Sequence, residues 1–336
     1  MAGRKKFSFA ILISIMLSVL ILTACSPTSS YAPGEISETG FCLDTVVTLT
    51  VYGTENKSIL QDAFSLIADY ESMLSRTREG SDIWNINHSS GAPVQVSDET
   101  SSLLQTALHY CELSDGAFDI TIAPVTDLWD FHGEGSGNVP DQEQLAEALS
   151  HVNYKNIKIT GNTVTLSDPQ AAIDLGAIAK GYIGDRVKEF LLSKGITSGM
   201  INLGGNVLVI GDKPDGSLWK IGIRKPFSEN GSELSAVVSA ADQSVVTSGT
   251  YERYFIKNNI LYHHILNPKT GYPAQTGLSS VSILSDSSTE GDALSTACFL
   301  LGPEKGMNLI EKTDGVEALF ITEEGELLYS IGFSST

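Results

Sequence analysis

Asp292 and Thr296 are spaced so that their oxygen atoms can act together. They lie four residues apart in segment 292–297 (DALSTA), which has the composition of a helix start. Residues four apart share one helix face, and carboxylate and hydroxyl oxygens are hard ligands that suit magnesium. The same pair also fits an ordinary helix in which Thr296 bonds back to its own backbone. The spacing therefore predicts a candidate magnesium site and leaves the structural alternative open.

Segment 173–182 (IDLGAIAKGY) has the residues of a phosphate-binding turn that leads into a helix. Gly176 lets a ligand approach the backbone, and free amides in the first helical turn favour an anion. Lys180 opposes the helix dipole there, and an anionic ligand would remove that conflict. The order differs from a Walker loop, because Lys180 precedes Gly181 rather than a serine or threonine. An amphipathic helix with a solvated lysine is the alternative.

His264 is a candidate general base in segment 262–271 (YHHILNPKTG). Adjacent side chains of a strand point to opposite faces, so only one of His263 and His264 can face a given site. A two-histidine metal chelate is therefore disfavoured. Imidazole ordinarily titrates near neutrality, and His264 lies beside an Asn-Pro turn, which suits proton transfer. A structural hydrogen-bonding role is equally consistent with the local sequence.

Two further segments, 202–206 (NLGGN) and 247–253 (TSGTYER), offer close backbone approach and hydroxyl groups. Neither segment is specific by itself. The chain has no Gly-x-Ser-x-Gly nucleophile motif, and no Gly-x-Gly-x-x-Gly fingerprint opens a strand–helix–strand unit. The sequence therefore indicates neither a serine hydrolase nor a Rossmann dinucleotide-binding domain.

These segments must be positioned by a mixture of helices and strands. Some segments have the apolar period of a helix and others the alternation of a strand, but they do not form a regular strand–helix–strand repeat. This favours an α+β fold with mixed, largely antiparallel sheets packed with helices. Ser58 is expected to cap the first helix. Strands are expected at 45–52, 199–211, 218–223, 236–240, 251–256, 261–265 and 279–284, hairpins over 156–167 and at 323–326, helices at 58–74, 101–114, 142–149, 176–194, 291–301 and 304–313, and a flexible loop at 133–137.

Taken together and in this order, the segments resemble the ApbE family of lipoprotein FAD:protein FMN transferases. The resemblance covers about residues 40–330 and is far more specific than any one motif. It is carried by segments 43–45, 81–83, 116–121, 174–182, 202–206, 219–224, 247–249, 264–273 and 292–297.

The resemblance implies an ApbE-like, T-fold-like body that cleaves FAD with the help of Mg²⁺. FMN would be joined through its phosphate to a Thr or Ser hydroxyl of an acceptor protein, and AMP would leave. Such an acceptor would be a subunit of a membrane redox pump or of an extracytoplasmic flavoprotein. Two alternatives stay open: a magnesium-dependent FAD pyrophosphatase that releases FMN and AMP, and a flavin-binding lipoprotein without turnover.

Site residues follow from the matching motifs of the family. The resemblance implies metal ligation by the backbone carbonyl of Ala177 and the side chains of Asp292 and Thr296, and catalysis by His264 and Lys180. Asn267 stands where Asp is common, which could alter the hydrogen bonding of His264, and Leu43 stands where Met is common. FAD is expected to contact Leu43, Ala117, Phe118, Asp119, Asp174, Lys180, His264 and Leu266.

Composition limits the partners of the protein. The 336 residues include 21 basic and 40 acidic side chains, for a formal net charge of −19. Such a charge repels nucleic acid and anionic lipid head groups, so nucleic acid is not an expected partner. A phosphate-bearing ligand must therefore be held by a local device such as a placed lysine or a divalent cation.

The N-terminus has the layout of an export signal. Arg4, Lys5 and Lys6 precede the uncharged apolar run 7–22. This N-terminal segment closes with a lipobox-like Leu-Thr-Ala-Cys at residues 22–25. We expect a signal peptide over 1–24, acylation of Cys25, a tether over 25–39 and one domain over 40–334. The mature protein would be extracytoplasmic and anchored by lipid to the bacterial cell membrane. Cys42, Cys111 and Cys298 are expected to be small buried residues, since they show no metal or disulfide spacing.

Overall fold

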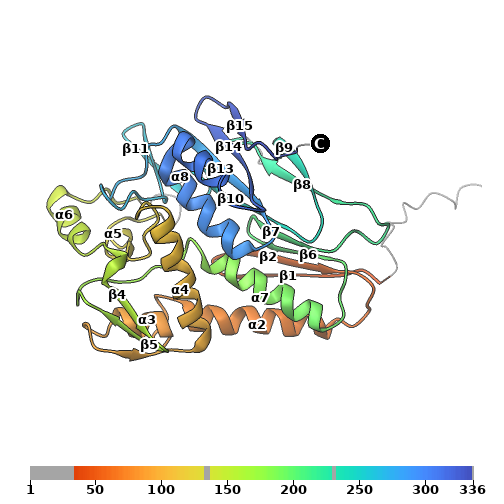
Figure 1. Ribbon diagram of the computed structural model, residues 1–336, viewed down its shortest axis with the longest axis horizontal. Coiled ribbons are helices and arrows are strands. Elements are labelled where there is room, and N and C mark those ends of the chain that lie inside the picture. Colours follow the sequence, from red (N-terminus) through yellow and green to blue (C-terminus); the bar gives the residue numbers. More distant parts are fainter. Residues whose placement is uncertain (1–33, 132–136, 229–231, 335–336) are drawn as a thin grey trace, which may run out of the picture.

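Eight strands form the central sheet, and every neighbouring pair in it is antiparallel. The computed structural model describes residues 34–131, 137–228 and 232–334. The strand order is β1-β2-β6-β7-β10-β13-β14-β15 (Figure 1). The strands are β1 (Ile36–Cys42), β2 (Thr45–Val51), β6 (Gly199–Leu203), β7 (Asn206–Ile210), β10 (Ser244–Gly249), β13 (Leu278–Ser285), β14 (Glu317–Thr322) and β15 (Leu327–Tyr329).

Three helices cover one face of this sheet. Val47, Leu49 and Ile201 are fully buried beneath them, because alternate side chains of a strand point to the same face. The longest helix runs along β10 and β13 (Figure 1). The helices are α2 (Ser58–Leu74), α7 (Ala179–Ser193) and α8 (Ser288–Ile310).

A two-stranded hairpin covers part of the opposite face. It consists of β8 (Trp219–Arg224) and β9 (Leu234–Ala240), whose alternate residues are buried. Trp219 packs there in one apolar cluster with Val209 of β7 and Val245 of β10. The sheet is thus buried on both faces over its centre.

Smaller elements pack beside the three-helix layer, at the left of Figure 1. Ser97 caps the longest of these helices by accepting from the Thr100 N–H, as helix N-caps do. The elements are α3 (Asp82–Asn87), α4 (Asp98–Leu113), α5 (Ala123–Thr126), α6 (Gln142–Ser150), the 3₁₀ turn Tyr154–Asn156, the sheet of β3 (Val94–Gln95), β5 (Thr163–Leu166) and β4 (Ile157–Thr160), and the hairpin of β11 (Tyr254–Lys257) and β12 (Ile260–His263).

The expected mixture of helices and antiparallel sheets is confirmed. The hairpin expected over 156–167 is present as β4 and β5, with its turn at Gly161-Asn162. The closing hairpin around 323–326 is present as β14 and β15. In both cases the turn-forming residues predict the chain reversal, and the alternation of buried and exposed side chains on the two strands fixes their register.

The single strand expected over 199–211 is wrong. Gly204 and Gly205 have positive φ angles of 65° and 107° and turn the chain back, so that β6 and β7 pair with each other. A Cβ atom on Gly204 would lie 2.0 Å from Thr45 Oγ1. This close approach requires glycine and packs the turn against the start of β2.

Two helix boundaries also differ from expectation. Ser58 does not cap α2; Lys57 holds the N-cap position without a side-chain hydrogen bond. The helices expected at 291–301 and 304–313 form one element, α8, which is kinked where Gly302 has φ 80° and Pro303 follows. The predicted break therefore exists, but the helix resumes directly after it.

The folded body begins before residue 40. Residues 36–39, expected within the tether over 25–39, belong to β1, where the Thr39 hydroxyl lies 3.0 Å from the Thr48 hydroxyl of β2. The signal peptide expected over 1–24 and the expected acylation site Cys25 lie outside the described residues, as does most of the loop expected at 133–137. Within the described ranges, no helix combines the length and apolar character needed to cross a bilayer.

Candidate active site

One pocket gathers every site residue expected from the sequence that lies within the described ranges. Its volume is about 420 Å³, in the usual range of small-molecule sites. Its wall is built from the β1–β2 turn, the end of α2, the chain around 117–126, the start of α7, the end of β10, the chain after β12, and α8. The expected residues in the wall are Leu43, Ala117, Phe118, Asp119, Asp174, Ala177, Lys180, His264, Leu266, Asp292 and Thr296.

The first turn of α7 and the second turn of α8 meet at the floor of this pocket. The Gly181 N–H of α7 donates to Asp292 Oδ2 of α8 over 2.9 Å. A Cβ atom on Gly181 would lie 2.1 Å from the Ser288 carbonyl oxygen, so only glycine permits this approach. The two segments singled out from the sequence therefore lie side by side.

Asp292 is a buried carboxylate that opens onto the pocket. Its side chain is 4% exposed, and burial raises its pKa. The Lys180 ammonium, the Gly181 N–H and the Asn206 side chain oppose this effect and favour the charged form. A second cation at the pocket would stabilise this carboxylate further.

The donor set fits a hard divalent cation. Ala177, Asp292 and Thr296 line the same pocket, and a backbone carbonyl, a carboxylate and a hydroxyl are the oxygen ligands that magnesium prefers. The Thr296 hydroxyl lies 3.2 Å from the Ser248 hydroxyl, which helps to fix its position. Among the described residues no group of three or more His, Cys, Asp or Glu could hold a metal. An ion here would therefore complete its shell with water and substrate phosphates.

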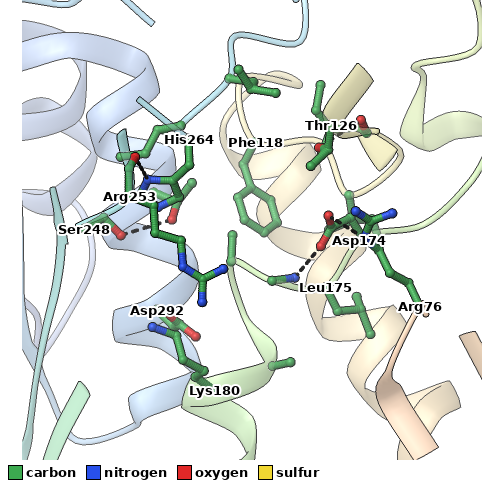
Figure 2. Close-up of a pocket in the computed structure, with 18 of the residues that line it drawn as sticks. Arg76, Phe118, Thr126, Asp174, Leu175, Lys180, Ser248, Arg253, His264 and Asp292 are labelled. Carbon is green, nitrogen blue, oxygen red and sulfur yellow. Dashed lines mark hydrogen bonds and ion pairs between the residues drawn. The ribbon is translucent and has the colours of Figure 1, made fainter. Parts of the chain in front are cut away.

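The amides at the start of α7 are less available than the sequence suggested. The Ala179 N–H donates to the Leu175 carbonyl over 2.8 Å, and the Gly181 N–H is taken by Asp292. Attraction of an anion therefore rests mainly on two side chains of the pocket wall, the Arg253 guanidinium and the Lys180 ammonium, which lies 3.5 Å from Asn206 Oδ1 (Figure 2). The helix start acts as a support for Asp292 more than as a direct phosphate cradle.

The two adjacent histidines point in different directions, as expected. His264 lines the pocket, whereas His263 is buried behind it, packs edge-on to Phe299 and has Nε2 3.1 Å from the Ala274 carbonyl oxygen. His264 Nδ1 lies 3.2 Å from the Arg253 carbonyl oxygen, an acceptor that requires a proton on Nδ1 and leaves Nε2 as the acceptor. Burial, with nearby positive groups, lowers the pKa of His264 to about 3.

The substitution at Asn267 does not disturb His264. Asn267 Oδ1 accepts from the Lys269 N–H over 2.8 Å, a local turn that an aspartate would make equally well. The hydrogen-bond partner of His264 Nδ1 is the Arg253 carbonyl oxygen instead. The expectation that Asn267 could alter the His264 hydrogen bond is therefore wrong.

The opposite end of the pocket has a separate ion-pair network. Arg76 Nε lies 3.1 Å from Asp174 Oδ2, and Arg76 Nη1 lies 2.6 Å from Asp127 Oδ1. Asp174 Oδ1 also accepts from the Gly176 N–H over 2.7 Å. Phe118 stands between this network and the end that holds Lys180 (Figure 2). An elongated ligand can therefore meet a polar group at each end of the pocket.

Asp119 lines the pocket, but its carboxylate is engaged elsewhere. Oδ1 accepts from both the N–H and the hydroxyl of Thr121, and Oδ2 accepts from the Tyr154 N–H over 2.9 Å. Burial raises the pKa of Asp119 against these hydrogen bonds. The side chain therefore holds the loop between Thr121 and Tyr154 in place.

Sequence reasoning missed the roles of Arg76 and Glu252. Desolvation in the pocket wall, with the Asp292 carboxylate nearby, raises the pKa of Glu252 to about 7. Arg76 follows the end of α2, and nothing in its local sequence marks it as part of a site. Its partner Asp174 lies almost a hundred residues further along the chain, so only tertiary packing reveals the pair.

Cations beside a buried carboxylate attract phosphate groups, and a neutral imidazole next to them can take a proton. A pocket of this kind places the protein among enzymes that act on phosphate-bearing substrates.

Comparisons with known proteins identify the family. The model of the ApbE family matches residues 43–320. A curated relative from Treponema pallidum, named FAD:protein FMN transferase, is 36% identical over 318 residues, covering 89% of this chain and 87% of the relative. A relative of the same name from Klebsiella pneumoniae is 37% identical over 282 residues, with coverages of 82% and 86%.

Solved structures agree with this result. The ApbE protein of Thermotoga maritima matches with a TM-score of 0.82 at 34% identity, over 88% of this chain and 97% of that one. The flavin transferase ApbE of Vibrio cholerae matches with a TM-score of 0.79 at 28% identity, over 89% and 98%. The chain therefore belongs to the ApbE family, and it is a transferase.

Proposed function

We propose that the protein is an Mg²⁺-dependent FAD:protein FMN transferase. It would break the FAD pyrophosphate, join the FMN phosphate to a Thr or Ser hydroxyl of an acceptor protein, and release AMP. The observation that supports this most directly is the meeting of Gly181 and Asp292 beside Lys180 and His264 in one pocket. The names of the curated relatives and the flavin transferase structures support the same reaction.

The residues of the chain divide the work between two ends of the pocket. Lys180 and Arg253 would hold the phosphates near Asp292, while the Asp174 end would bind a ring system. Since Asp174 Oδ2 is held by Arg76, its position is fixed before a ligand arrives. Preorganised charges of this kind need no rearrangement during the reaction.

His264 would serve as the general base. The Arg253 carbonyl accepts from Nδ1 and so directs Nε2 toward the proton to be removed. The acceptor O–H would lose its proton to Nε2 as its oxygen bonds to the FMN phosphorus, and the bond to the AMP oxygen would break. Mg²⁺ held by Ala177, Asp292 and Thr296 would neutralise charge on the phosphates.

Incubation with FAD, MgCl₂ and a purified redox-pump subunit tests the reaction. We expect a covalently fluorescent acceptor band, an added mass of FMN less water, and one AMP released per label. Unlabelled acceptor with free FMN and AMP would instead indicate a pyrophosphatase, and intact FAD after hours a carrier. Asp292→Ala should abolish labelling; full labelling by this variant would contradict the proposed metal site.

We also propose that the mature protein starts at an acylated Cys25 and is held by lipid at the outer side of the bacterial cell membrane. The support is the basic start, apolar run and lipobox-like end of residues 1–25. Metabolic labelling with an alkyne-bearing palmitate should label the wild type and not Cys25→Ser. If cell fractionation finds the wild type and Cys25→Ser equally in the soluble fraction, the proposed lipid anchor is contradicted.

A further inference from the structure

Asp185 links α7 to the first turn of α8, although neither the sequence motifs nor the pocket wall include it. Its carboxylate accepts four hydrogen bonds from α8 and the residue before it. Oδ1 accepts from the Ser288 N–H over 2.8 Å, while Oδ2 accepts from the Thr289 N–H over 2.9 Å. Oδ2 also accepts from the Thr289 hydroxyl over 2.6 Å and the Ser287 hydroxyl over 2.8 Å.

This contact is one half of a reciprocal arrangement. One turn earlier in α7, the Gly181 N–H donates to Asp292, which lies one turn later in α8. Each helix therefore offers a carboxylate to backbone N–H groups in the first turn of the other. Gly181 and Asp185 share one face of α7, and Ser288 and Asp292 share one face of α8, because residues four apart are stacked on a helix.

Close packing makes the arrangement rigid. The missing Cβ of Gly181 lets the Ser288 carbonyl approach, and Ser288 itself is fully buried. The negative charge of Asp185 also lies at the positive end of the α8 dipole, which favours this geometry. In Figure 1 the two helices are adjacent, and α8 carries the pocket residues Asp292 and Thr296.

We propose that Asp185 is a positioning residue for the reaction. By holding the start of α8 against α7, it fixes Asp292 and Thr296 in the pocket wall that Ala177 also lines, and so sets the affinity of the cation site. The proposal deepens the proposed function and rests on it for the identity of the cation. Asp185 lies behind the pocket wall and is not a catalytic residue.

The test compares Asp185→Ala and Asp185→Asn with a matched loss of a helix cap elsewhere. Asp141→Ala is suitable, because Asp141 caps α6 by accepting from the Glu143 and Gln144 N–H groups. Mg²⁺ binding is measured by calorimetry with MgCl₂ alone. Hydrogen exchange is followed in peptides covering 177–182 and 288–296, and stability is followed by urea unfolding.

We expect Asp185→Ala to weaken Mg²⁺ binding about 10- to 100-fold, the usual effect of removing a group that orients metal ligands. Exchange should accelerate in both peptides. Asp185→Asn should lose less of its Mg²⁺ affinity than Asp185→Ala, since the amide carbonyl oxygen can still accept one backbone N–H. Asp141→Ala should unfold at lower urea concentration while Mg²⁺ affinity stays within about twofold.

Unchanged Mg²⁺ affinity and exchange in both Asp185 variants would overturn the proposal, and so would an equal loss of affinity in Asp141→Ala. If the wild type itself binds no Mg²⁺, the cation role in the proposed function fails. The exchange data then decide on Asp185 alone: acceleration confined to the two peptides supports its positioning role, and unchanged protection overturns it.

Discussion

At the scale of single residues, the site is defined by groups whose protonation is set by their surroundings. His264 and Glu252 lie in the same pocket wall but respond oppositely to desolvation, since burial disfavours the charged form of each. The pKa of His264 falls to about 3 and that of Glu252 rises to about 7. Each shift has a measurable consequence.

His264→Asn is expected to lower the rate of FMN transfer by about 10²- to 10⁴-fold, the usual contribution of a general base. Asparagine can still donate to the Arg253 carbonyl but has no acceptor in place of Nε2. The rate is measured with the fluorescent-acceptor assay at saturating FAD, so that a change in FAD affinity does not enter the comparison. Transfer at the wild-type rate would show that the proton is accepted elsewhere.

FAD affinity is expected to fall as the pH rises from 6 to 8. Glu252 is neutral below its pKa of about 7 and negative above it, so deprotonation adds a charge that repels the anionic ligand. One such charge should change the dissociation constant by about three- to tenfold. In Glu252→Gln, the FAD dissociation constant measured by fluorescence titration should no longer depend on pH in this range. If the same pH dependence remains, another group causes it.

At the scale of elements, the important contact is the crossing of α7 and α8. Two glycines in α7 face different neighbours: Gly181 meets the backbone of α8, while Gly184 meets the flexible ends of Leu208 and Leu203. The same substitution at these two positions therefore separates a backbone clash from ordinary side-chain packing.

Gly181→Ala is expected to lower the free energy of unfolding by about 1–3 kcal/mol, because its Cβ would lie 2.1 Å from the Ser288 carbonyl oxygen. It should also weaken FMN transfer by displacing Asp292. Gly184→Ala should stay within about 1 kcal/mol of the wild type, since leucine side chains can shift and alanine favours a helix. Urea unfolding and the fluorescent-acceptor assay measure both effects; equal behaviour of the two variants would refute the argument.

At the scale of the whole molecule, stability should depend on pH through a contact distant in sequence. His151 Nδ1, at the end of α6, lies 2.8 Å from Asp168 Oδ2, after β5. This hydrogen bond raises the pKa of His151. The pKa of Asp168 is lowered first by the Gln170 N–H, which donates to its carboxylate, and then by the contact with His151. The pair ties α6 to the small sheet of β3, β5 and β4.

The stabilising effect of His151 is complete below its unfolded-state pKa of about 6.5 and is lost as the pH rises through the higher folded-state value. We therefore expect the free energy of unfolding to fall by up to about 1 kcal/mol between pH 6 and pH 8. His151→Gln should remove that part of the slope in urea unfolding curves. An identical slope in the variant would show that other groups cause it.

The sequence by itself determined the segments that carry chemistry and most element types. Asp292 and Thr296 are fixed on one face by helical periodicity, and the separation of His263 from His264 follows from strand alternation. Local turn chemistry predicted the hairpin at Gly161-Asn162. These features depend on residues close together in the chain, where spacing alone dictates geometry.

Only the tertiary structure decided what depends on distant segments. The pairing of β6 with β7, the entry of residues 36–39 into the sheet and the link from Arg76 to Asp174 each depend on a partner elsewhere in the chain. Two further contacts also join distant segments: the Gly181 N–H of α7 donates to Asp292, and Asp185 accepts from the start of α8. Such contacts form because packing brings together groups that are far apart in the chain, and local spacing does not say which distant segment will lie alongside.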